Sequence, residues 1–401
     1  MLFLLEIKKI VKSIPYWIFV AAIVTALFSQ GVFRFHDDLL QEPQPGGSYG
    51  FKQEEIPEMI MPAALSGLWM EFCENNYTTY PIGFVKHVRL SEDDQGKVAA
   101  ILSEITGEQK DAILGKSGSE KLKPAVRDGM DYSRFKERMA LVDDLLGGGS
   151  SYSPDSLAGY GTVPLTYEEA KERYELAVSS DQVTGGYARL FSDYAGVMVL
   201  SILPVFLAVI LCMKDRRAKM EALIYTKKIS AAKLTLIRFI ALVIAAMIPV
   251  FILSYVSNMM VWGASKGMQL DYLAPLKYDL GWLLPSVMIS TAVGMFLTEL
   301  TGSPAAVAVQ GLWWMFDVNL GIKTVSSGYS LFRLSPRHNA GAESWFRTED
   351  YLDHFQDLLQ NRFLIVGISL VLVLLTILIY EAKRRGKFGG NNRNRKKKSK
   401  A

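Results

Sequence analysis

Residues that could carry catalytic or metal-binding chemistry are few and scattered along this 401-residue chain. No two histidines stand at the spacing of a paired metal site such as HExxH; the four are His36, His87, His338 and His354. The two cysteines, Cys73 and Cys212, form no CxxC pair and indicate no disulfide framework. The sequence therefore predicts no catalytic residue, no metal site and no cofactor.

Gly115-Lys116-Ser117 looks like the end of a phosphate-binding loop. A Walker A loop needs a glycine five residues before the second one, and position 110 is a lysine. No apolar strand precedes the tripeptide either. We interpret it as a polar turn that caps a helix, and we expect no ATP site in this chain.

The elements that must position any functional residue are membrane helices. Half of the residues are apolar (50%), 21% are charged, and the mean hydropathy is +0.17. Windows of about 19 residues find six stretches that are apolar and long enough to cross a bilayer: 14–33, 194–213, 239–262, 280–297, 304–320 and 363–380. We predict an all-α polytopic membrane protein with six transmembrane helices, which excludes a soluble enzyme, a disordered chain and a single-anchor protein.

One ionisable residue, Asp317, falls inside these six stretches, near the outer end of the fifth. Ion-coupled transporters usually carry several buried ionisable groups, so their scarcity disfavours that class. Asp317 follows two tryptophans of the kind found at membrane interfaces. It is a candidate for the substrate path; the alternative is an interfacial residue that reaches headgroups or caps the following segment.

Basic residues mark three segments: 1–13, 214–234 and the tail 381–401, which carries ten Lys or Arg against Glu381. Lys and Arg are retained on the cytoplasmic side of membranes. We therefore expect both termini and the segment after the second span to be cytoplasmic, which requires an even number of crossings. The tail is expected to bind anionic headgroups rather than nucleic acid.

Residues 1–13 place Phe3, Ile7 and Ile10 on one helical face, with lysines opposite. We predict an interfacial amphipathic helix that ends before Pro15. An N-terminal extension of the first span is the alternative. A cleaved signal peptide is disfavoured, because no small-x-small cleavage site follows the apolar stretch.

Residues 34–193 contain no spanning stretch and are acidic overall. Their position between a cytoplasmic start and a basic segment predicts an extracytoplasmic domain. Capping-box sequences at Ser91 and Thr166 each open a helix, the first of which is expected to stop at Gly107. A third helix, 135–146, ends at a Gly- and Ser-rich loop. The domain is therefore predicted to be mainly helical, with a core of its own.

The most informative segment is the cytoplasmic loop 214–238. Residues 218–224 predict a short amphipathic helix with Met220, Leu223 and Ile224 on one side and Glu221 elsewhere. Such a helix offers a docking surface to a cytoplasmic partner. The alternative is a basic loop held at anionic headgroups.

This segment resembles the coupling helix of type-two ABC transporter (ABC-2) permeases. In that family a charged run is followed by a Thr-Leu-Glu-like triplet, two leucines, a short turn and a Lys or Arg that enters the next span. Here 219–221 takes the place of the triplet, Leu223 and Ile224 that of the leucines, and Lys233 to Arg238 the entry. The triplet's Thr and the turn's usual Pro are absent. The phrases YPIGFVKHVRLSEDDQGKVAAILSEITG and VTGGYARLFSDYAG resemble a bacterial subgroup with a large outer domain between the first two spans.

The resemblance implies a permease subunit of an ABC exporter in a bacterial plasma membrane, which moves cargo outward by alternating access. It implies a homo- or heterodimer of permeases with two separate ATPase subunits, and a re-entrant outer loop within 321–362. Met220, Glu221, Leu223 and Ile224 would contact the ATPase. Peptides, drugs and lipids stay open as cargo. The alternatives are a non-transporting receptor or scaffold whose outer domain binds peptide or cell-wall material, and, least favoured, an intramembrane enzyme.

Overall fold

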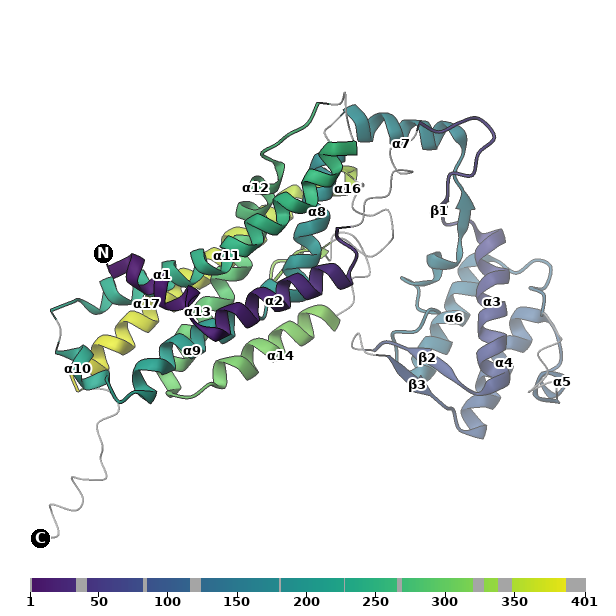
Figure 1. Cartoon of the computed structure of the whole chain (residues 1–401). Helices are drawn as coiled ribbons and strands as arrows, with labels where there is room; N and C mark the ends of the chain where they lie inside the picture. Colours follow the sequence, from purple (N-terminus) through teal and green to yellow (C-terminus); the bar gives the residue numbers. More distant parts are fainter. Residues whose placement is uncertain are drawn as a thin grey trace, which may run out of the picture. The chain divides into compact units, whose positions relative to one another are not determined.

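A computed structural model of the chain describes residues 2–33, 42–81, 85–115, 124–179, 182–226, 228–264, 269–319, 328–337 and 348–386. In these ranges the chain is mostly helical and holds four strands of three residues each (Figure 1). It divides into two compact units. We call residues 1–40, 175–317 and 324–401 the helical unit, and residues 41–174 with 318–323 the inserted unit.

The inserted unit packs its helices around one apolar core and pairs its short strands two by two. Strand β1 is antiparallel to β4, and β2 is antiparallel to β3. The core includes Leu68, Leu102 and Phe135, which come from three different helices and are fully buried. The described elements are β1 (Phe51–Gln53), α3 (Pro57–Glu74), β2 (Tyr77–Thr79), β3 (Lys86–Val88), α4 (Glu92–Thr106), α5 (Lys110–Gly115), α6 (Tyr132–Leu146), the 3-10 turn η2 (Leu157–Tyr160), β4 (Thr162–Pro164) and the first part of α7 (Tyr167–Ser179).

Local capping chemistry sets the ends of these helices. The Ser91 hydroxyl accepts a hydrogen bond from the Asp94 amide and starts α4, which ends at Gly107 with φ of 79°. At the start of α7, Thr166 and Glu169 exchange backbone-to-side-chain hydrogen bonds in a complete capping box. Both predicted caps and the stop at Gly107 are confirmed. Lys116 and Ser117 of the predicted polar turn lie outside the described residues.

We expect the core of the inserted unit to be sensitive to truncation at Leu102. Leu102→Ala removes a fully buried side chain from the α3–α4–α6 core and should cost about 2–5 kcal/mol. The matched control is Leu141→Ala in α6, whose side chain is 43% exposed and should cost well under half as much. Chemical denaturation of residues 42–174 expressed alone measures both. Equal effects of the two substitutions would contradict this assignment of the core.

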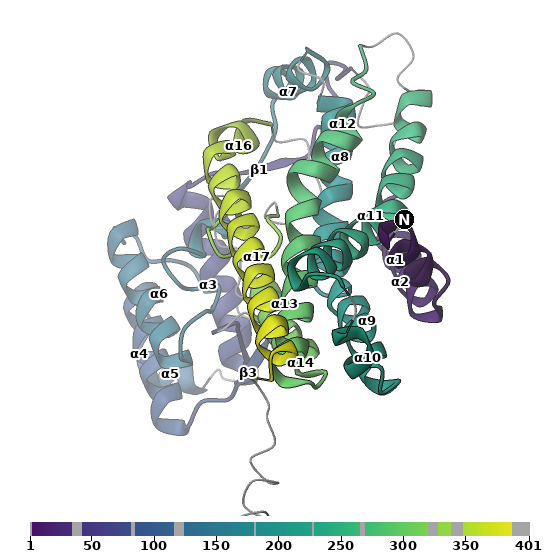
Figure 2. The same cartoon turned by 90° about the vertical axis from the view of Figure 1, so that its left-hand side faces the viewer.

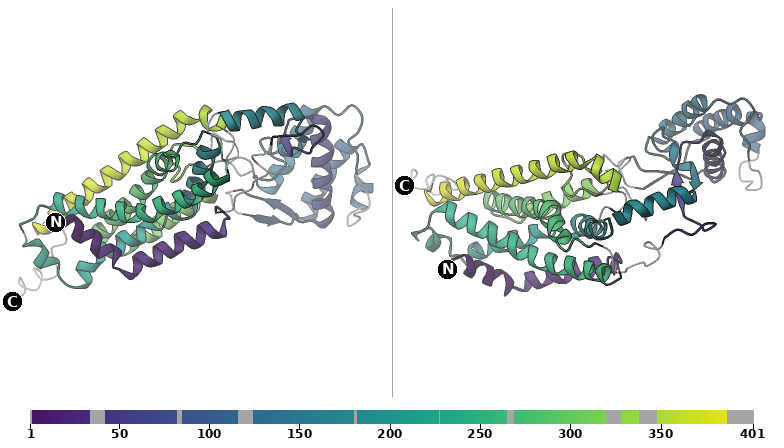
Figure 3. Two further views of the ribbon diagram at one scale, coloured as in Figure 1. Left: turned by 45° about the horizontal axis from the view of Figure 1, so that its top comes forward. Right: turned by 90° about the horizontal axis from the view of Figure 1, so that it is seen from above.

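The helical unit has helices that are mostly long and apolar. Helix α13 packs most extensively against α17 and α9, and α2 and α17 lie on opposite sides of the unit in both views of Figure 3. The described elements are α1 (Leu2–Val11), α2 (Ile14–Ser29), the end of α7, α8 (Gln182–Ala195), the π-helical turn η3 (Gly196–Leu200), α9 (Pro204–Arg217), α10 (Glu221–Tyr225), α11 (Ala231–Ala264), α12 (Ala274–Tyr278), the π-helical turn η4 (Asp279–Leu283), α13 (Leu284–Thr301), α14 (Ala305–Asn319), α16 (Thr348–Asp353) and α17 (Phe355–Arg384).

Three described helices are long and apolar enough to cross a membrane: Ala231–Gly263, Ala274–Thr301 and Phe355–Arg384. The number rises to five if each of two bent pairs is one span, namely Leu2–Val11 with Ile14–Ser29 (63°) and Thr184–Leu200 with Pro204–Lys214 (42°). The predicted fifth stretch, 304–320, forms α14, which has 15 described residues. The mostly helical fold is therefore as predicted, and three helices, or up to five with the bent pairs, meet the length and apolarity of a span where six were predicted.

Most helices extend beyond the apolar stretches that predicted them. Helix α11 begins at Ala231, within the predicted loop 214–238, and α17 begins at Phe355, within the predicted outer loop. The predicted second span 194–213 starts instead in α8, inside the region assigned to the outer domain, and bends before Pro204. The reason is that a hydropathy window ends at the first polar residues, while the helical hydrogen bonds continue through them.

Each π-helical turn is followed closely by a proline. Pro204 lies just after η3, and Pro285 just after η4. Proline has no amide hydrogen for the carbonyl one turn earlier, so the helix must adjust locally at these points. Helix α13 also approaches α9 very closely at Gly294. A Cβ added to this glycine would lie only 2.6 Å from the Ala208 Cβ. Small residues permit such contacts between apolar helices.

Candidate functional site

The predicted coupling segment forms a short helix at one end of the helical unit. Helix α9 ends at Arg217, and Lys219 adopts the left-handed conformation with φ of 56°, which turns the chain. Helix α10 follows, and Met220 is its N-cap residue. The predicted helix 218–224 is thus present, but it starts at Glu221 and runs to Tyr225.

Helix α10 is fixed to the C-terminal end of α17 (Figures 1 and 2). Arg384 donates hydrogen bonds to the Tyr225 carbonyl at 3.1 Å and to the Ile229 carbonyl at 2.8 Å. The ring of Tyr225 meets that of Tyr380 edge to face, with 5.3 Å between centroids. These contacts link the position of α10 to that of a long apolar helix.

The apolar side of α10 is exposed in the chain by itself. The Met220 side chain is 43% exposed and Leu223 is 54% exposed, while Ile224 is half-buried. The side chain of Glu221 lies outside the described residues, so its predicted polar contact is not located. An exposed Met-Leu pair on a helix that is held at its C-terminal end is a suitable docking surface.

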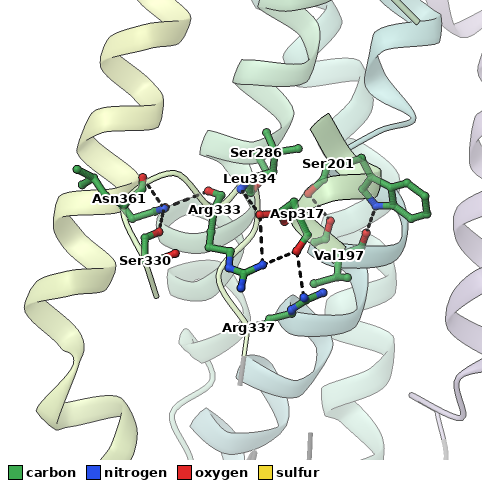
Figure 4. A network of polar contacts seen from close by, with 12 residues as sticks. Val197, Ser201, Ser286, Asp317, Ser330, Arg333, Leu334, Arg337 and Asn361 are labelled. Atoms are coloured by element: carbon green, nitrogen blue, oxygen red, sulfur yellow. Dashed lines mark hydrogen bonds and ion pairs between the residues drawn. The ribbon is translucent and has the colours of Figure 1, made fainter. Parts of the chain in front are cut away.

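Asp317 lies near the end of α14, far along the chain from α10, and is buried. One carboxylate oxygen accepts a hydrogen bond from the Leu334 amide at 3.3 Å and lies 3.7 Å from the Arg333 guanidinium. Arg333 and Arg337 also donate to the Asp317 carbonyl (Figure 4). The structure therefore brings Asp317 together with the segment 328–337, which it caps, and not with the coupling helix.

The segment 328–337 has little regular structure, yet much of it is buried, including Tyr329, Leu334 and Ser335. Its carbonyls are satisfied by side chains from neighbouring helices. The Asn361 amide donates to the carbonyls of residues 330, 331 and 333 at 2.7–3.0 Å (Figure 4). The Ser286 hydroxyl donates to the Leu334 carbonyl at 2.6 Å. Irregular backbone is tolerated at membrane depth where it is buried in protein in this way.

Arg362 connects this segment to two helices. Its guanidinium donates to the Trp282 carbonyl and the Ser286 hydroxyl at 2.9 Å, and to the carbonyls of Arg333 and Leu334 at 3.2 Å. Sequence analysis missed this residue, since the predicted sixth span began one position later. The adjacent pair Asn361-Arg362 at the edge of a strongly apolar stretch was the available signal.

A second feature that sequence analysis missed is a cavity of about 490 Å³ at the end of the helical unit where α8, α12, α16 and the start of α17 meet. Four aromatic side chains and two buried arginines line it: Tyr278, Trp282, Tyr351, Phe355, Arg189 and Arg362. The rings of Trp282 and Tyr351 stack with 6.4 Å between centroids. These residues come from three separate parts of the chain, so no local motif reveals them.

Asp279 is a third missed residue. It lies in η4, one position before the predicted fourth span, and is fully buried. Its carboxylate interacts with the side chain of Ser254 in α11. A buried acid in an apolar spanning helix is a candidate functional residue on physical grounds.

Within the described ranges, no group of three or more His, Cys, Asp or Glu side chains could hold a metal ion. Helix α10 lies at one end of the unit, and a cavity lined by aromatic rings and arginines lies at the other. Comparisons with protein-family models, with curated proteins and with solved structures find no match to this chain.

Proposed function

We propose that the chain is the membrane-spanning permease subunit of an ATP-driven ABC exporter. In this proposal α14 is the sixth crossing, together with the three long helices and the two bent pairs. The inserted unit is extracytoplasmic, both termini are cytoplasmic, and the membrane is a bacterial plasma membrane. A second permease and two ATPase subunits complete the complex, with membrane lipids around it.

The observation that carries the proposal is α10. This helix presents Met220 and Leu223 to solvent and is joined by Arg384 to the end of α17. A force on α10 would therefore be transmitted directly to a spanning helix. If transport is driven by ATP, the ATP has to be hydrolysed by a partner subunit, because we expect no ATP site in this chain.

The length of α17 supports the arrangement. Arg362 and Arg384 lie on this one helix, roughly 33 Å apart at 1.5 Å of rise per residue. The hydrocarbon core of a bilayer is about 30 Å thick. The cavity and the docking helix thus lie at opposite ends of a membrane-length element.

The test is Leu223→Asp. If α10 docks on an ATPase subunit, a carboxylate at this position enters an apolar interface without a partner, and the interface is weakened by several kcal/mol. The tagged chain is purified from host membranes in a mild detergent, and ATP hydrolysis is measured. We expect the wild type to retain a nucleotide-hydrolysing subunit and Leu223→Asp to lose at least nine-tenths of the activity.

The matched control is Leu141→Asp, which places the same charge on an exposed leucine of the inserted unit. It should leave ATP hydrolysis unchanged. A receptor or scaffold would copurify with no ATPase activity at all. Wild-type activity in Leu223→Asp would instead show that α10 is a surface loop, and the exporter proposal would lose its main support.

A further inference from the structure

We propose that Asp279 is a proton-binding site, and that its carboxyl group keeps a proton at neutral pH while η4 packs against α11. The side chain is fully buried. It lies within Ala274–Thr301, one of the helices that are long and apolar enough to cross a membrane. The proposal concerns the ionisation of one residue and does not depend on an ATPase partner.

No basic side chain pairs with Asp279 in the part of the chain that the structure describes. The elements that pack against η4 are η3, α8, α11, α12 and α13, and Arg362 of α17 donates a hydrogen bond to the Trp282 carbonyl of this turn. The charged residues of these five elements are Arg189 and Asp193 on α8, Lys233 and Arg238 on α11, Lys277 on α12 and Glu299 on α13. None of them forms an ion pair or a hydrogen bond with the Asp279 carboxyl.

The other titratable groups on these five elements are tyrosines, which are uncharged at neutral pH. They are Tyr187 and Tyr194 on α8, Tyr255 on α11 and Tyr278 on α12. An ionised Asp279 would therefore be a buried charge without a counter-charge. Burial of such a charge is so unfavourable that the group takes up a proton and becomes neutral instead.

The contact with Ser254 suits a protonated carboxyl. Ser254 lies on α11 and is buried, and its hydroxyl interacts with the Asp279 side chain. A hydroxyl both donates and accepts hydrogen bonds, and so does a protonated carboxyl, so the two groups satisfy each other in an apolar surrounding. One hydroxyl does not replace the water around a carboxylate, which has several acceptor positions to fill.

A proton fits this site better than a metal cation does. Hard cations need several oxygen ligands around them. Within the described ranges, Ser254 is the one side chain that interacts with the Asp279 carboxyl, and no cluster of His, Cys, Asp or Glu side chains could hold a metal ion. A proton needs a carboxyl oxygen and a hydrogen-bond partner, and both are present.

Infrared spectroscopy measures the protonation directly, because a protonated carboxyl and a carboxylate absorb at different frequencies. The purified full chain is compared at neutral pH with Asp279→Asn, the uncharged isostere of the protonated residue. We expect the wild type to show the C=O band of a protonated acid, which the variant lacks. The matched control is Asp271→Asn. A hydrogen bond from Lys277 lowers the pKa of Asp271, whose side chain is 29% exposed, so this variant should lose carboxylate bands only.

Proton release on unfolding provides a second measurement. Each chain is unfolded at neutral pH in a weakly buffered solution that contains a pH-indicator dye. An unfolded aspartic acid is ionised in water at this pH. The wild type should therefore release one proton more per chain than Asp279→Asn, and Asp271→Asn should release as many as the wild type. Thermal unfolding verifies that each variant is folded at the start.

The two measurements can overturn the proposal independently. If Asp279→Asn loses carboxylate bands, or if the wild type releases no additional proton, then Asp279 is ionised in the folded chain. A bound sodium ion would give this result too, because it leaves the carboxylate ionised. Ser254→Ala should keep the acid band and shift it to higher frequency, since the carboxyl loses its hydrogen bond; an unshifted band would overturn the role of Ser254.

Discussion

Replacing Arg362 with leucine is expected to lower the unfolding temperature of the purified chain by roughly 5 °C or more. The guanidinium makes charged hydrogen bonds to Trp282, Ser286 and the backbone of 333–334, and such bonds contribute about 1.5–3 kcal/mol each. Leucine fills part of the volume but donates no hydrogen bond. A total loss of at least 3 kcal/mol follows even if the individual contributions are not additive.

The same substitution should open the segment 328–337 to trypsin. Arg333 and Arg337 are cleavage sites within it, and Arg333 is buried. Arg362 holds the carbonyls of residues 333 and 334, so the backbone at the first site should become accessible once the guanidinium is gone. Mass spectrometry of limited digests measures the cut after each arginine.

Two further variants separate charge from geometry. Arg362→Lys keeps the positive charge but loses the planar fork that reaches several acceptors, so it should recover only part of the stability. Arg385→Leu removes an arginine that is 62% exposed and should change neither property. If Arg362→Leu keeps the wild-type unfolding temperature and the wild-type resistance to trypsin, then Asn361 and Ser286 hold the segment 328–337 without the Arg362 guanidinium.

The features that could be predicted from the sequence are those set by neighbouring residues. Ser91 stands three residues before Asp94, and Gly107 permits the left-handed turn that ends α4, so both boundaries follow from local chemistry. Apolar runs likewise predicted the three helices that are long and apolar enough to cross a membrane, because a bilayer-length stretch needs no tertiary information. The order of the helices along the chain follows directly from the capping residues and the apolar runs.

The interior of the helical unit could not be predicted in the same way. Arg362 contacts residues 28 to 80 positions away, and Arg189 contacts Tyr278, which is 89 positions away. Hydropathy windows exclude such residues, because a charged side chain ends the apolar run even when tertiary contacts bury it. The buried polar residues of this chain that hydropathy windows miss therefore lie at the ends of its apolar stretches.

Removing Asp317 or Arg333 singly is expected to destabilise the chain more than removing both. The two side chains are 5% and 8% exposed and lie 3.7 Å apart. Breaking a buried ion pair leaves an uncompensated charge and costs about 3–5 kcal/mol, whereas apolar replacement of both partners is often nearly neutral. We expect Asp317→Leu and Arg333→Met each to lower the unfolding temperature, and the double variant to recover at least half of the loss.

This double-mutant cycle also decides what Asp317 does. The Leu334 amide and the Arg333 guanidinium both reach its carboxylate, so the geometry favours a residue that fixes the segment 328–337. In that role ATP hydrolysis by the purified complex should recover together with stability in the double variant. If Asp317 instead lines a substrate path, the double variant should regain stability but not cargo-stimulated hydrolysis, and Asp317→Asn should lose that hydrolysis while keeping its unfolding temperature. A cycle with additive effects on stability would show that the two side chains are not coupled at all.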